Sequence, residues 1–519
     1  MSRINSNIPS VIAQSHLAKT GRELELRLER LSTGLRINRG ADDPAGLIIS
    51  ERLRSDINGV NQGIKNSDRA SSVISTAEAS LSEVADLLNS IKGLIVESAN
   101  TGASGPDERR ANQLQIDSAI DSITRISNTA SFGGLKLLNG TLDYRLSGLH
   151  TSAISRAQIN NASFVDSANL QVEVDVVASA QVGSLYYNGG TTPPGVTLSS
   201  MTLQIAGGQG VETITIPSGR PLDAVVAAVN NLASLTGVRA ELINGNANSG
   251  IVFNAIDYGS QTFVSVKRQG GPSNPANDSF ATYRFSDASP IPNDSPFDWA
   301  NLISGGVMVT ADRDYGQDVE ALVNGNLASG DGLKLSVNSS ALGLELLLSE
   351  DYAIDPTQTA TTFNITGGGA LFQLGPDVTA LQQANFGVPS VAASNLGATV
   401  VAGAVEFLSS LKSGQSNSIT SSVSRGDFSP SSDILDAAID QISILRGRLG
   451  AFERNVLETN TRSLQASFEN LSASSSAIRD ADFAFETSQL TRAQILSSAG
   501  TSVLSLANQQ SQQVLQLLG

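Results

Sequence analysis

The stretch LSTGLRINRGADDPAGLIISERL, Leu31 to Leu53, decides the fold of the N-terminal part of this chain. Apolar residues lead into it at helical spacing, a glycine and two acids interrupt it, and a proline opens a second apolar segment. We expect Gly40 and Pro44 to end one helix and to start another. Asp42 and Asp43 precede the second helix, where carboxylates can cap exposed N–H groups and favour the helix dipole. An ordinary helix–turn–helix joint would use the same local chemistry.

Apolar residues on both sides of this break recur mainly at steps of three and four, which is the pattern of a coiled-coil seam. The seam before the break consists of Leu17, Leu24, Leu28, Leu31 and Leu35. The longer seam after it consists of Leu53, Ile57, Val60, Ile64, Ser67, Ser71, Ile74, Ala77, Leu81, Val84, Leu88, Ile91 and Ile95. A helix over 44–100 would be on the order of 80 Å long, so we expect a rod with partners along its length.

The C-terminal end repeats this arrangement in reverse order. Its rod seam consists of Leu435, Ala438, Ile442, Leu445, Leu449, Phe452, Val456, Leu464, Phe468 and Leu471. The small polar run SASSSA, 472–477, is predicted to break the helix. The last segment, 485–518, carries Leu496, Val503, Ala507, Val514 and Leu518. Each end is therefore predicted to be an outer helix, a break and an inner rod.

The middle of the chain, about 170–405, has strand-like character. LQVEVDVV alternates with a period of two, and MTLQIAGGQGVETITIPSG is typical of a hairpin around glycines. PLDAVVAAVNNLASLTGV is predicted to be a short helix, followed by strands at GIVFNA and FVSVKR. Residues 176–405 contain 7 basic and 18 acidic residues, a net of −11 out of −16 for the chain. We therefore predict an α+β protein in which long antiparallel helical rods enclose an outward-facing, solvated insert.

Composition excludes several classes of function. The net charge of −16 argues against nucleic-acid binding, and the absence of cysteine removes disulfides, thiolate metal sites and cysteine nucleophiles. The sequence contains no run of about 20 apolar residues, so it predicts no membrane span. The N-terminus lacks the pattern of a Sec signal peptide. The two outermost segments, 1–40 and 480–519, each have one apolar stripe, so we expect both to be largely disordered until copies pack together.

Several motifs, in the same order at both ends, resemble bacterial flagellin. They are LSTGLRIN (31–38), ADDPAGLIISERL (41–53), SFGGLKLLNG (131–140), AIRDADFAFETSQLTRAQIL (477–496) and ANQQSQQVLQLLG (507–519). The segment 201–253 also resembles a repeat found in flagellin and hook-protein inserts. This resemblance implies a structural subunit that polymerises into the flagellar filament, a helical propeller for swimming. A hook–filament junction protein of the same family is the alternative, and an enzyme carried in the insert is a third reading.

The resemblance implies three domains and their interfaces. Residues 1–43 and 476–519 would form an inner helical tube, 44–175 and 406–475 a rod domain with short β segments, and 176–405 an outer α+β insert with two subdomains. The inner-tube seam would be Leu17, Leu24, Leu28, Leu31, Leu35, Leu496, Val503, Val514 and Leu518. The rod packing would involve Leu53, Ile57, Val60, Ile64, Leu81, Leu88, Ile91, Ile442, Leu445, Leu449 and Phe452.

The resemblance also implies partners and a route out of the cell. The chain would polymerise with itself, meet filament cap and hook-junction proteins, and bind an export chaperone through the C-terminal helix, about 482–518. It would leave through the flagellar type III apparatus and reside outside the cell in the filament. Recognition by an innate immune receptor is not implied, because the expected arginine is Ser90 here and the expected acid is Gln115.

The sequence offers no catalytic or metal site of a known pattern. His16 and His150 are the two histidines, and HExxH, P-loop and GxGxxG motifs are absent. DRDYGQD, Asp312 to Asp318, has oxygen ligands at alternate positions beside a glycine, as calcium loops do, but it lacks the EF-hand register. We interpret it as a solvated acidic turn, and we expect no cofactor and no enzymatic activity. Serine and threonine in the insert could carry glycans, although any solvated insert is rich in them.

Overall fold

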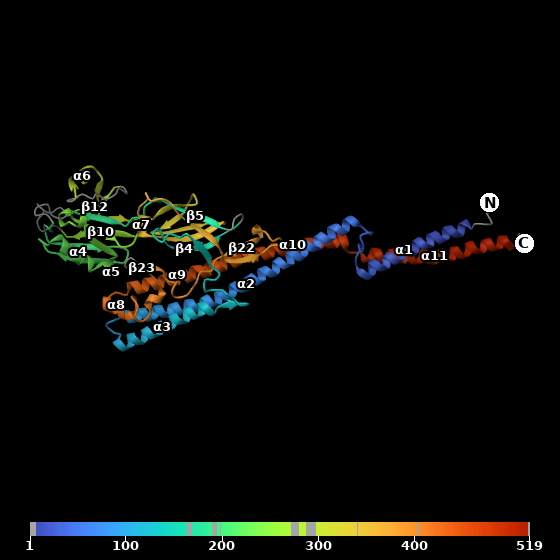
Figure 1. Cartoon of the computed structure of the whole chain (residues 1–519), viewed down its shortest axis with the longest axis horizontal. Helices are drawn as coiled ribbons and strands as arrows, with labels where there is room; N and C mark the ends of the chain where they lie inside the picture. Colours follow the sequence, from blue (N-terminus) through green and yellow to red (C-terminus); the bar gives the residue numbers. More distant parts are fainter. Residues whose placement is uncertain are drawn as a thin grey trace. The chain divides into compact units, whose positions relative to one another are not determined.

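A computed structural model gives the fold of the chain (Figure 1). It describes residues 7–162, 164, 169–188, 195–197, 199–270, 280–286, 297–339, 341–355, 357–401 and 404–516, with the side chains of 511 and 514–516 left out. The chain divides into two compact units. Unit 1 comprises Met1–Ser71, Phe372–Gln383 and Phe452–Gly519, and unit 2 comprises Ser72–Leu371 and Ala384–Ala451.

Long helices from both ends of the chain build unit 1. They are α1 (Ile8–Thr33), the first half of α2 (Pro44–Ala99), α10 (Glu458–Arg479) and α11 (Phe483–Gln516). Asn7 and Asp482 begin α1 and α11 as side-chain caps, since they accept the N–H groups of Ser10 and Phe485 at 3.2 and 3.0 Å. The predicted α+β class with long terminal helices is confirmed. The predicted break at 472–477 is wrong, because α10 runs through it to Arg479.

The N-terminal break differs from its prediction in two details. Gly34, with φ 73°, ends α1 by the left-handed conformation that glycine adopts most readily, so Gly40 lies in the following turn. Asp43 caps α2 by accepting the N–H of Gly46 at 2.9 Å. Asp42 instead accepts the N–H groups of Arg39 and Asn38, at 2.9 and 3.0 Å, and these bonds lower the pKa of its carboxyl. Asp42 therefore closes the turn and does not cap the helix.

The same break is tied to the C-terminal one. The N–H of Arg36 donates to the carbonyl of Arg479 at 2.7 Å, and the N–H of Ala481 donates to the carbonyl of Gly34 at 2.9 Å. These bonds satisfy backbone groups that a helix end would otherwise leave open. Ile37 is buried beneath this junction. The two breaks thus form one ordered joint of unit 1.

Helices also form one side of unit 2. They are the second half of α2 together with α3 (Pro106–Thr129), α8 (Ile419–Arg425) and α9 (Ser429–Phe452), with the short 3₁₀ turn η4 (Leu408–Leu411). Buried positions on α2 and α9 recur at three and four: Ile74, Ala77, Leu81, Val84, Leu88, Ile91 and Ile95, then Leu435, Ala438, Ile442, Leu445 and Leu449. Arg446 pairs with Glu78 at 2.9 Å, and Lys92 pairs with Asp436, so charged residues flank this seam.

A π turn shifts the C-terminal seam by one residue. It is η5 (Glu453–Leu457), between α9 and α10, and a π turn places one extra residue in the helix. Leu457 is therefore buried where the regular spacing predicted Val456, which is half-buried. Sequence spacing alone does not reveal such a turn, because the apolar residues on both sides keep helical steps.

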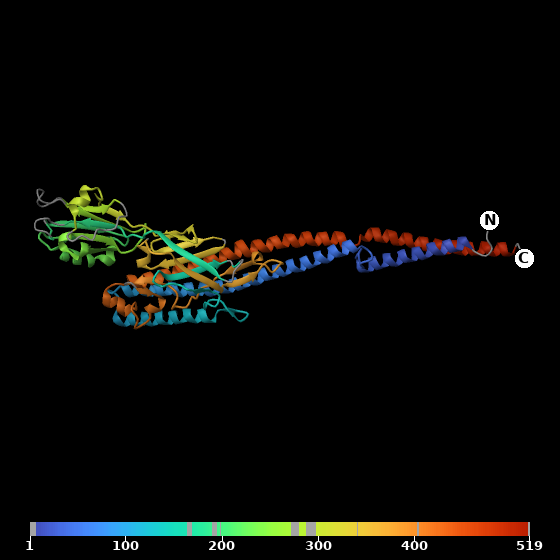
Figure 2. The ribbon, with the colours of Figure 1, turned by 45° about the horizontal axis from the view of Figure 1, so that its top comes forward.

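The rest of unit 2 is β-structure in two lobes with separate cores (Figures 1 and 2). Lobe A contains Phe363 and Val174 at its centre, and lobe B contains Phe253 and Leu203. Lobe A has two sheets, in the orders β16-β15-β5-β20-β3 and β17-β18-β19-β4, and lobe B has two, in the orders β13-β12-β6-β10-β9 and β14-β11-β7-β8. All neighbouring strands in these sheets are antiparallel.

The strands of lobe A are β3 (Tyr144–Ser147), β4 (Ile154–Ala162), β5 (Leu170–Ala178), β15 (Glu320–Val323), β16 (Asn326–Leu327), β17 (Ser329–Asp331), β18 (Lys334–Asn338), β19 (Leu342–Leu348) and β20 (Thr361–Gly368). The strands of lobe B are β6 (Ser184–Tyr187), β7 (Met201–Ala206), β8 (Val211–Ile216), β9 (Val238–Leu242), β10 (Ile251–Ala255), β11 (Phe263–Gln269), β12 (Thr282–Phe285), β13 (Met308–Thr310) and β14 (Arg313–Tyr315). The predicted strands at LQVEVDVV, GIVFNA and FVSVKR and the hairpin of β7 and β8 are all present.

Short elements complete the two units. The helices are α4 (Leu222–Asn230), α5 (Ala233–Thr236), α6 (Trp299–Ser304) and α7 (Glu350–Ala353), with the 3₁₀ turns η1 (Ile243–Gly245), η2 (Ala247–Ser249) and η3 (Ala380–Gln382). The hairpins are β1 (Ser131–Phe132) with β2 (Leu135–Lys136), β21 (Ala370–Gln373) with β22 (Gln383–Phe386), and β23 (Thr399–Val401) with β24 (Ala404–Glu406). The helix predicted over 221–238 is two short helices divided at Asn231 and Leu232, where Leu232 departs from helical φ/ψ, and Gly237 with φ 72° ends the second.

Arg448 joins helix α9 to lobe A. Its guanidinium donates to the carbonyl of Asn160 at 3.2 Å and lies 5.2 Å from the ring centre of Phe386. Burial lowers the pKa of Arg448, while the carboxylates of Glu345 and Asp143 favour its charged form. A buried guanidinium with these partners holds one orientation, so Arg448 ties α9 to lobe A.

Candidate assembly surface

Helices α1 and α11 lie side by side over most of their length (Figures 1 and 2). Small side chains allow this approach: Ala13 on α1 and Ala493 and Ala507 on α11 are buried, and a Cβ on Gly500 would meet Leu17 at 3.3 Å. Ser10 donates to the side chain of Asn508 at 2.8 Å. The pair is therefore held by close packing of small residues and by polar contacts, with few large apolar residues between the helices.

One buried carboxylate lies within this pair. Glu486 has a side chain that is only 3% exposed, and it accepts hydrogen bonds from Arg27 at 2.8 Å and from Arg30 at 3.1 Å. A buried charge is stable only when opposite charges and hydrogen bonds replace its water. Glu486 thus fixes how α11 is aligned along α1. These three residues were not singled out from the sequence, although Glu486 is the one acid within α11.

Large apolar side chains remain exposed on the helix pair and beside it. On α1 and α11 they are Ile8, Val11, Ile12, Leu28, Phe483, Phe485, Ile495, Leu496, Val503 and Leu506. At the start of α2, Ile48 and Ile49 are exposed as well. Single exposed apolar residues are ordinary, but a set of this size on two paired helices is typical of a protein–protein contact.

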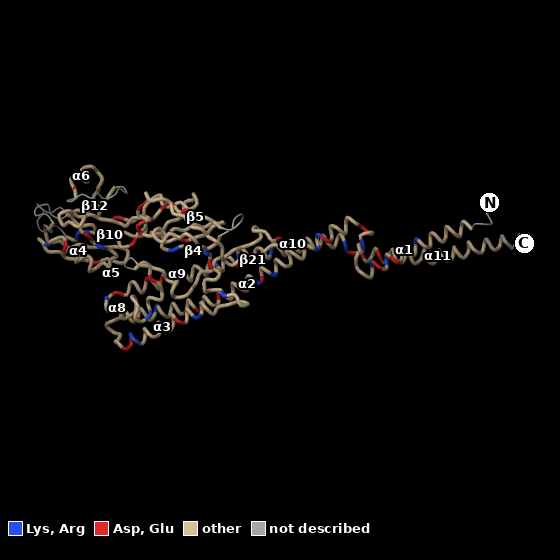
Figure 3. The backbone as a smooth tube through the Cα atoms, in the orientation of Figure 1, with Lys and Arg blue, Asp and Glu red and all other residues tan. Residues whose placement is uncertain are grey.

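The free ends of these helices also lack charge (Figure 3). Residues 4–18 and 493–519 contain no Asp, Glu, Lys or Arg, although the chain as a whole carries −16. Copies of an acidic protein repel one another, and an uncharged surface avoids this repulsion where copies meet. The lack of charge and the exposed apolar side chains therefore both indicate a protein–protein contact surface.

The predicted inner-tube residues fall into two groups. Leu17, Leu24, Leu31 and Leu35 are half-buried within unit 1, whereas Leu28, Leu496 and Val503 are exposed. Val514 and Leu518 lie outside the part whose side chains are described. The expectation of disordered ends differs from the structure, in which α1 and α11 are helical and partner each other. Each helix still leaves apolar surface uncovered, so one chain does not complete this region.

The predicted rod residues lie in both units. Val60, Leu81, Leu88, Ile91, Ile442, Leu445 and Leu449 are buried, and Leu53, Ile57, Ile64 and Phe452 are half-buried. In unit 1, Asn460 of α10 donates to Ser67 of α2 at 3.1 Å, and Arg479 pairs with Glu51 at 3.0 Å. Within each unit, the structure therefore brings parts of the two predicted rods into contact.

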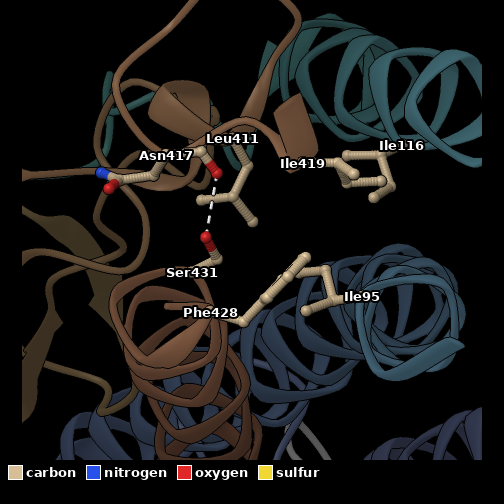
Figure 4. Close-up of a pocket in the computed structure, with 7 residues that line it drawn as sticks. All are labelled: Ile95, Ile116, Leu411, Asn417, Ile419, Phe428 and Ser431. Atoms are coloured by element: carbon tan, nitrogen blue, oxygen red, sulfur yellow. Dashed lines mark hydrogen bonds between the residues drawn. The ribbon is translucent and has the colours of Figure 1, made fainter. Parts of the chain in front are cut away.

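A small apolar gap lies among the helices of unit 2 (Figure 4). It is lined by Ile95, Ile116, Leu411, Asn417, Ile419, Phe428 and Ser431. Ser431 donates to the carbonyl of Asn417 at 2.9 Å, so its hydroxyl is already used. Gln113 nearby binds the carbonyl of Leu411 and the N–H of Ile419 at 2.9 and 2.8 Å. The gap is a packing joint between α2, α3 and α8 and offers no polar group to a ligand.

The prediction of a solvated acidic turn at Asp312–Asp318 is wrong in part, because Arg313–Tyr315 is strand β14, and the acids of this segment contact separate partners. Asp312 pairs with Lys267 at 3.0 Å, Asp314 accepts the N–H of Ser184 at 2.8 Å, and Asp318 accepts the N–H groups of Ser260 and Gly332. Burial raises the pKa of Asp314. Among the described residues, no three His, Cys, Asp or Glu side chains gather as metal ligands would.

Comparison with known proteins identifies the family. The profile for the bacterial flagellin N-terminal helical region matches residues 4–143, that for the flagellin C-terminal helical region matches 432–518, and the flagellin hook IN motif matches 202–257. Together these matches cover more than half of the chain. The chain belongs to the bacterial flagellin family.

Relatives of this flagellin match it from end to end. Flagellin of Salmonella muenchen is 27% identical, flagellin of Escherichia coli K12 is 28% identical and flagellin B of Helicobacter pylori is 25% identical, and each match covers 99% of both chains. The chain is therefore a structural subunit of the bacterial flagellar filament.

Solved structures similar to this flagellin include hook-associated protein 3 of Legionella pneumophila, with 11% identity, a TM-score of 0.29, and coverage of 82% of this chain and 97% of that one. The D2-D3 domains of the flagellar cap protein of Serratia marcescens have 17% identity, a TM-score of 0.24, and coverage of 41% of this chain and 98% of that domain pair. Among the described residues, we find no helix with the length and apolar character needed to cross a bilayer.

Proposed function

We propose that the exposed apolar side of the α1/α11 pair is the surface through which copies of this chain join in the filament. The observation that carries this proposal is the coincidence of exposed apolar residues with charge-free helix ends. Covering several large side chains favours association by roughly 1.5–3 kcal/mol for each one fully buried. The inner-tube seam would then combine the half-buried leucines of α1 with Leu496 and Val503 of α11.

We propose three domains for this subunit, with the bounds predicted from the sequence. Residues 1–43 and 476–519 would form the inner tube, 44–175 and 406–475 the rod layer, and 176–405 the outer insert. Lobe B lies wholly within 176–405 and supports one subdomain of the insert. Lobe A supports a second subdomain, although its strands β3, β4 and most of β5 come from the range before residue 176. The net charge of −11 over 176–405 suits a surface that faces water.

We further propose that the chain is exported unfolded, resides outside the cell and has no enzymatic activity. Before export, a chaperone would cover the exposed face of α11, because this face would otherwise associate prematurely. Cap and hook-junction proteins would meet the filament at its ends. The junction-protein alternative has less support, since the full-length curated relatives named above are flagellins.

A pair of substitutions tests the assembly surface. Leu496→Asp with Val503→Asp places charge on the exposed face of α11 and leaves its contact with α1 unchanged. We expect filaments, seen by electron microscopy, to be lost, while circular dichroism of the dilute protein stays within a few per cent of the parent. The matched control is Val211→Asp with Val309→Asp, two exposed valines of lobe B, which should polymerise normally. Normal filaments from the first variant would refute the proposed surface.

A further inference from the structure

A short turn of unit 1 projects two apolar side chains into solvent. We call Leu374–Gln382, the turn between β21 and β22, the apolar knob. Val378 and Leu381 in it are 84% and 87% exposed, the highest values among the large apolar residues of the described chain. The surrounding sequence FQLGPDVTALQQANF, 372–386, contains one charged residue, Asp377. An ordinary solvated loop of this acidic chain would carry more charge and less apolar surface.

The apolar knob is internally ordered. Gln382 accepts the N–H of Asp377 at 2.7 Å and donates to the carboxylate of Asp377 at 3.1 Å. Gln373 donates to the carbonyls of Gly375 and Asp377 at 2.9 and 2.7 Å. The only carboxylate of the segment is thus used within the turn, and the two apolar side chains are held outward. A binding surface that is already ordered loses less conformational entropy when it docks.

Helices of unit 1 anchor the base of the apolar knob. Asn460 of α10 donates to the carbonyl of Leu374 at 3.0 Å, and Asn66 of α2 donates to that of Gln373 at 3.1 Å. A Cβ on Gly59 would meet Pro376 at 2.9 Å, and one on Gly63 would meet the carbonyl of Leu374 at 2.9 Å. The absence of side chains at these two glycines therefore lets the turn lie directly on α2.

We propose that the apolar knob docks into a second copy of this chain and forms a contact between subunits in the filament. The proposal rests on the function as a filament subunit and adds a contact separate from the terminal helices. Filament growth presents every copy with neighbours at high local concentration, so a copy of the chain is the partner always at hand. The neutral surface of the apolar knob also avoids the repulsion that a net charge of −16 imposes elsewhere.

Thiol protection tests this contact, and the chain lacks cysteine, so a single thiol reports one position. Val378→Cys is treated with a maleimide as dilute monomer and again as sedimented filaments. We expect the thiol to react at least about tenfold more slowly in filaments. This is the protection expected if the thiol becomes accessible only when a contact of about 1.4 kcal/mol breaks. Leu327→Cys, at a side chain 69% exposed in lobe A, should react equally fast in both states.

The outcomes separate this contact from the filament function itself. Filaments that form while Val378→Cys stays fully reactive would overturn the docking proposal and leave the filament function intact. Failure of the unmodified chain to form filaments would instead count against its function. Equal protection at both positions would indicate bundling of filaments, and protection seen only when another flagellar protein is added would indicate a different partner. Both results would overturn the proposed contact between subunits within one filament.

A second variant measures the strength of the contact. Val378→Ser with Leu381→Ser removes apolar surface from side chains that contact little within the chain, so folding should be unchanged by circular dichroism. We expect the lowest protein concentration that supports filament growth to rise by about tenfold or more. Leu327→Ser is the matched control and should leave that concentration unchanged. An unchanged value for the double variant would contradict the proposal.

Discussion

Unit 2 and the α1/α11 pair of unit 1 use their apolar residues in opposite ways. In unit 2, large side chains such as Leu81, Phe253 and Phe363 are fully buried within one chain. In the helix pair, the buried residues are small or charged, namely Ser10, Ala13, Glu486, Ala493 and Ala507, and the large ones are half-buried or exposed. One region buries its large apolar residues within a single chain, whereas the other leaves many of them exposed.

Deleting residues 482–519 tests this difference with the largest expected effect. The deletion removes α11, so α1 loses its partner and the exposed face of α11 disappears. We expect filament formation to be abolished, as judged by sedimentation and electron microscopy. Unit 2 should keep its structure, because none of its elements lies in the deleted segment.

The state of unit 2 in the truncated chain can be followed through Trp299, the single tryptophan of the chain, which is buried in lobe B. Its fluorescence should report the same urea midpoint as in the full chain. A truncated protein that still polymerised normally would refute the tube arrangement. A large fall in the urea midpoint would instead show that the two regions depend on each other.

The sequence predicts the fold in outline because helices with apolar seams reveal themselves by spacing. The rod residues from Val60 to Ile95 and from Leu435 to Leu449 follow their predicted periodicity. What spacing does not reveal is the local exception: the π turn that moves burial to Leu457, and the left-handed Gly34 that ends α1 before Gly40. These depend on single backbone conformations and not on hydrophobic pattern.

The assembly surface shows a similar limit. Leu496 and Val503 were predicted as seam residues, and they are exposed and available for a neighbour. Glu486 could not be assigned a role from sequence, because its partners Arg27 and Arg30 lie more than 450 positions away along the chain. Val378 and Leu381 were missed for another reason: the turn that holds them outward depends on side-chain amides in an irregular segment.

Replacing the buried carboxylate of the helix pair should have an intermediate effect. Glu486→Gln keeps the size of the side chain but leaves Arg27 and Arg30 without an anion. Breaking a buried, hydrogen-bonded charge pair costs about 2 kcal/mol or more, so we expect amide exchange across α1 to speed up by roughly thirtyfold. Glu29→Gln is the control, because Glu29 pairs with the exposed Arg39 and should contribute under about 1 kcal/mol. Equal effects of the two substitutions would show that burial of Glu486 is unimportant.

The smallest expected effect concerns the joint between lobes A and B. Asp318 accepts the N–H groups of Ser260 in lobe B and of Gly332 in lobe A, at 3.0 and 2.8 Å, together with the hydroxyl of Ser260. Burial alone would raise the pKa of Asp318, but the hydrogen bonds from Gly332 and Ser260 outweigh it and lower the pKa. A lowered pKa in the folded protein means that the ionised carboxylate stabilises the joint above its ordinary pKa of 3.8.

This stabilisation should be lost as the pH falls below about 4 and through the lowered pKa of the folded state. In Asp318→Asn, the amide oxygen can still accept the N–H groups of Ser260 and Gly332. The amide nitrogen replaces the oxygen that accepts the Ser260 hydroxyl, so that hydrogen bond is lost. We expect it to cost about 1 kcal/mol at pH 7 and to remove part of the acid sensitivity of the urea midpoint, read from Trp299 fluorescence. Asp331→Asn, at an exposed acid beside Gly332, should leave both the midpoint and its pH dependence unchanged. If Asp318→Asn retained the full acid sensitivity, the hydrogen bonds of Asp318 would not be its cause. Other carboxylates would then have to hold lobes A and B together.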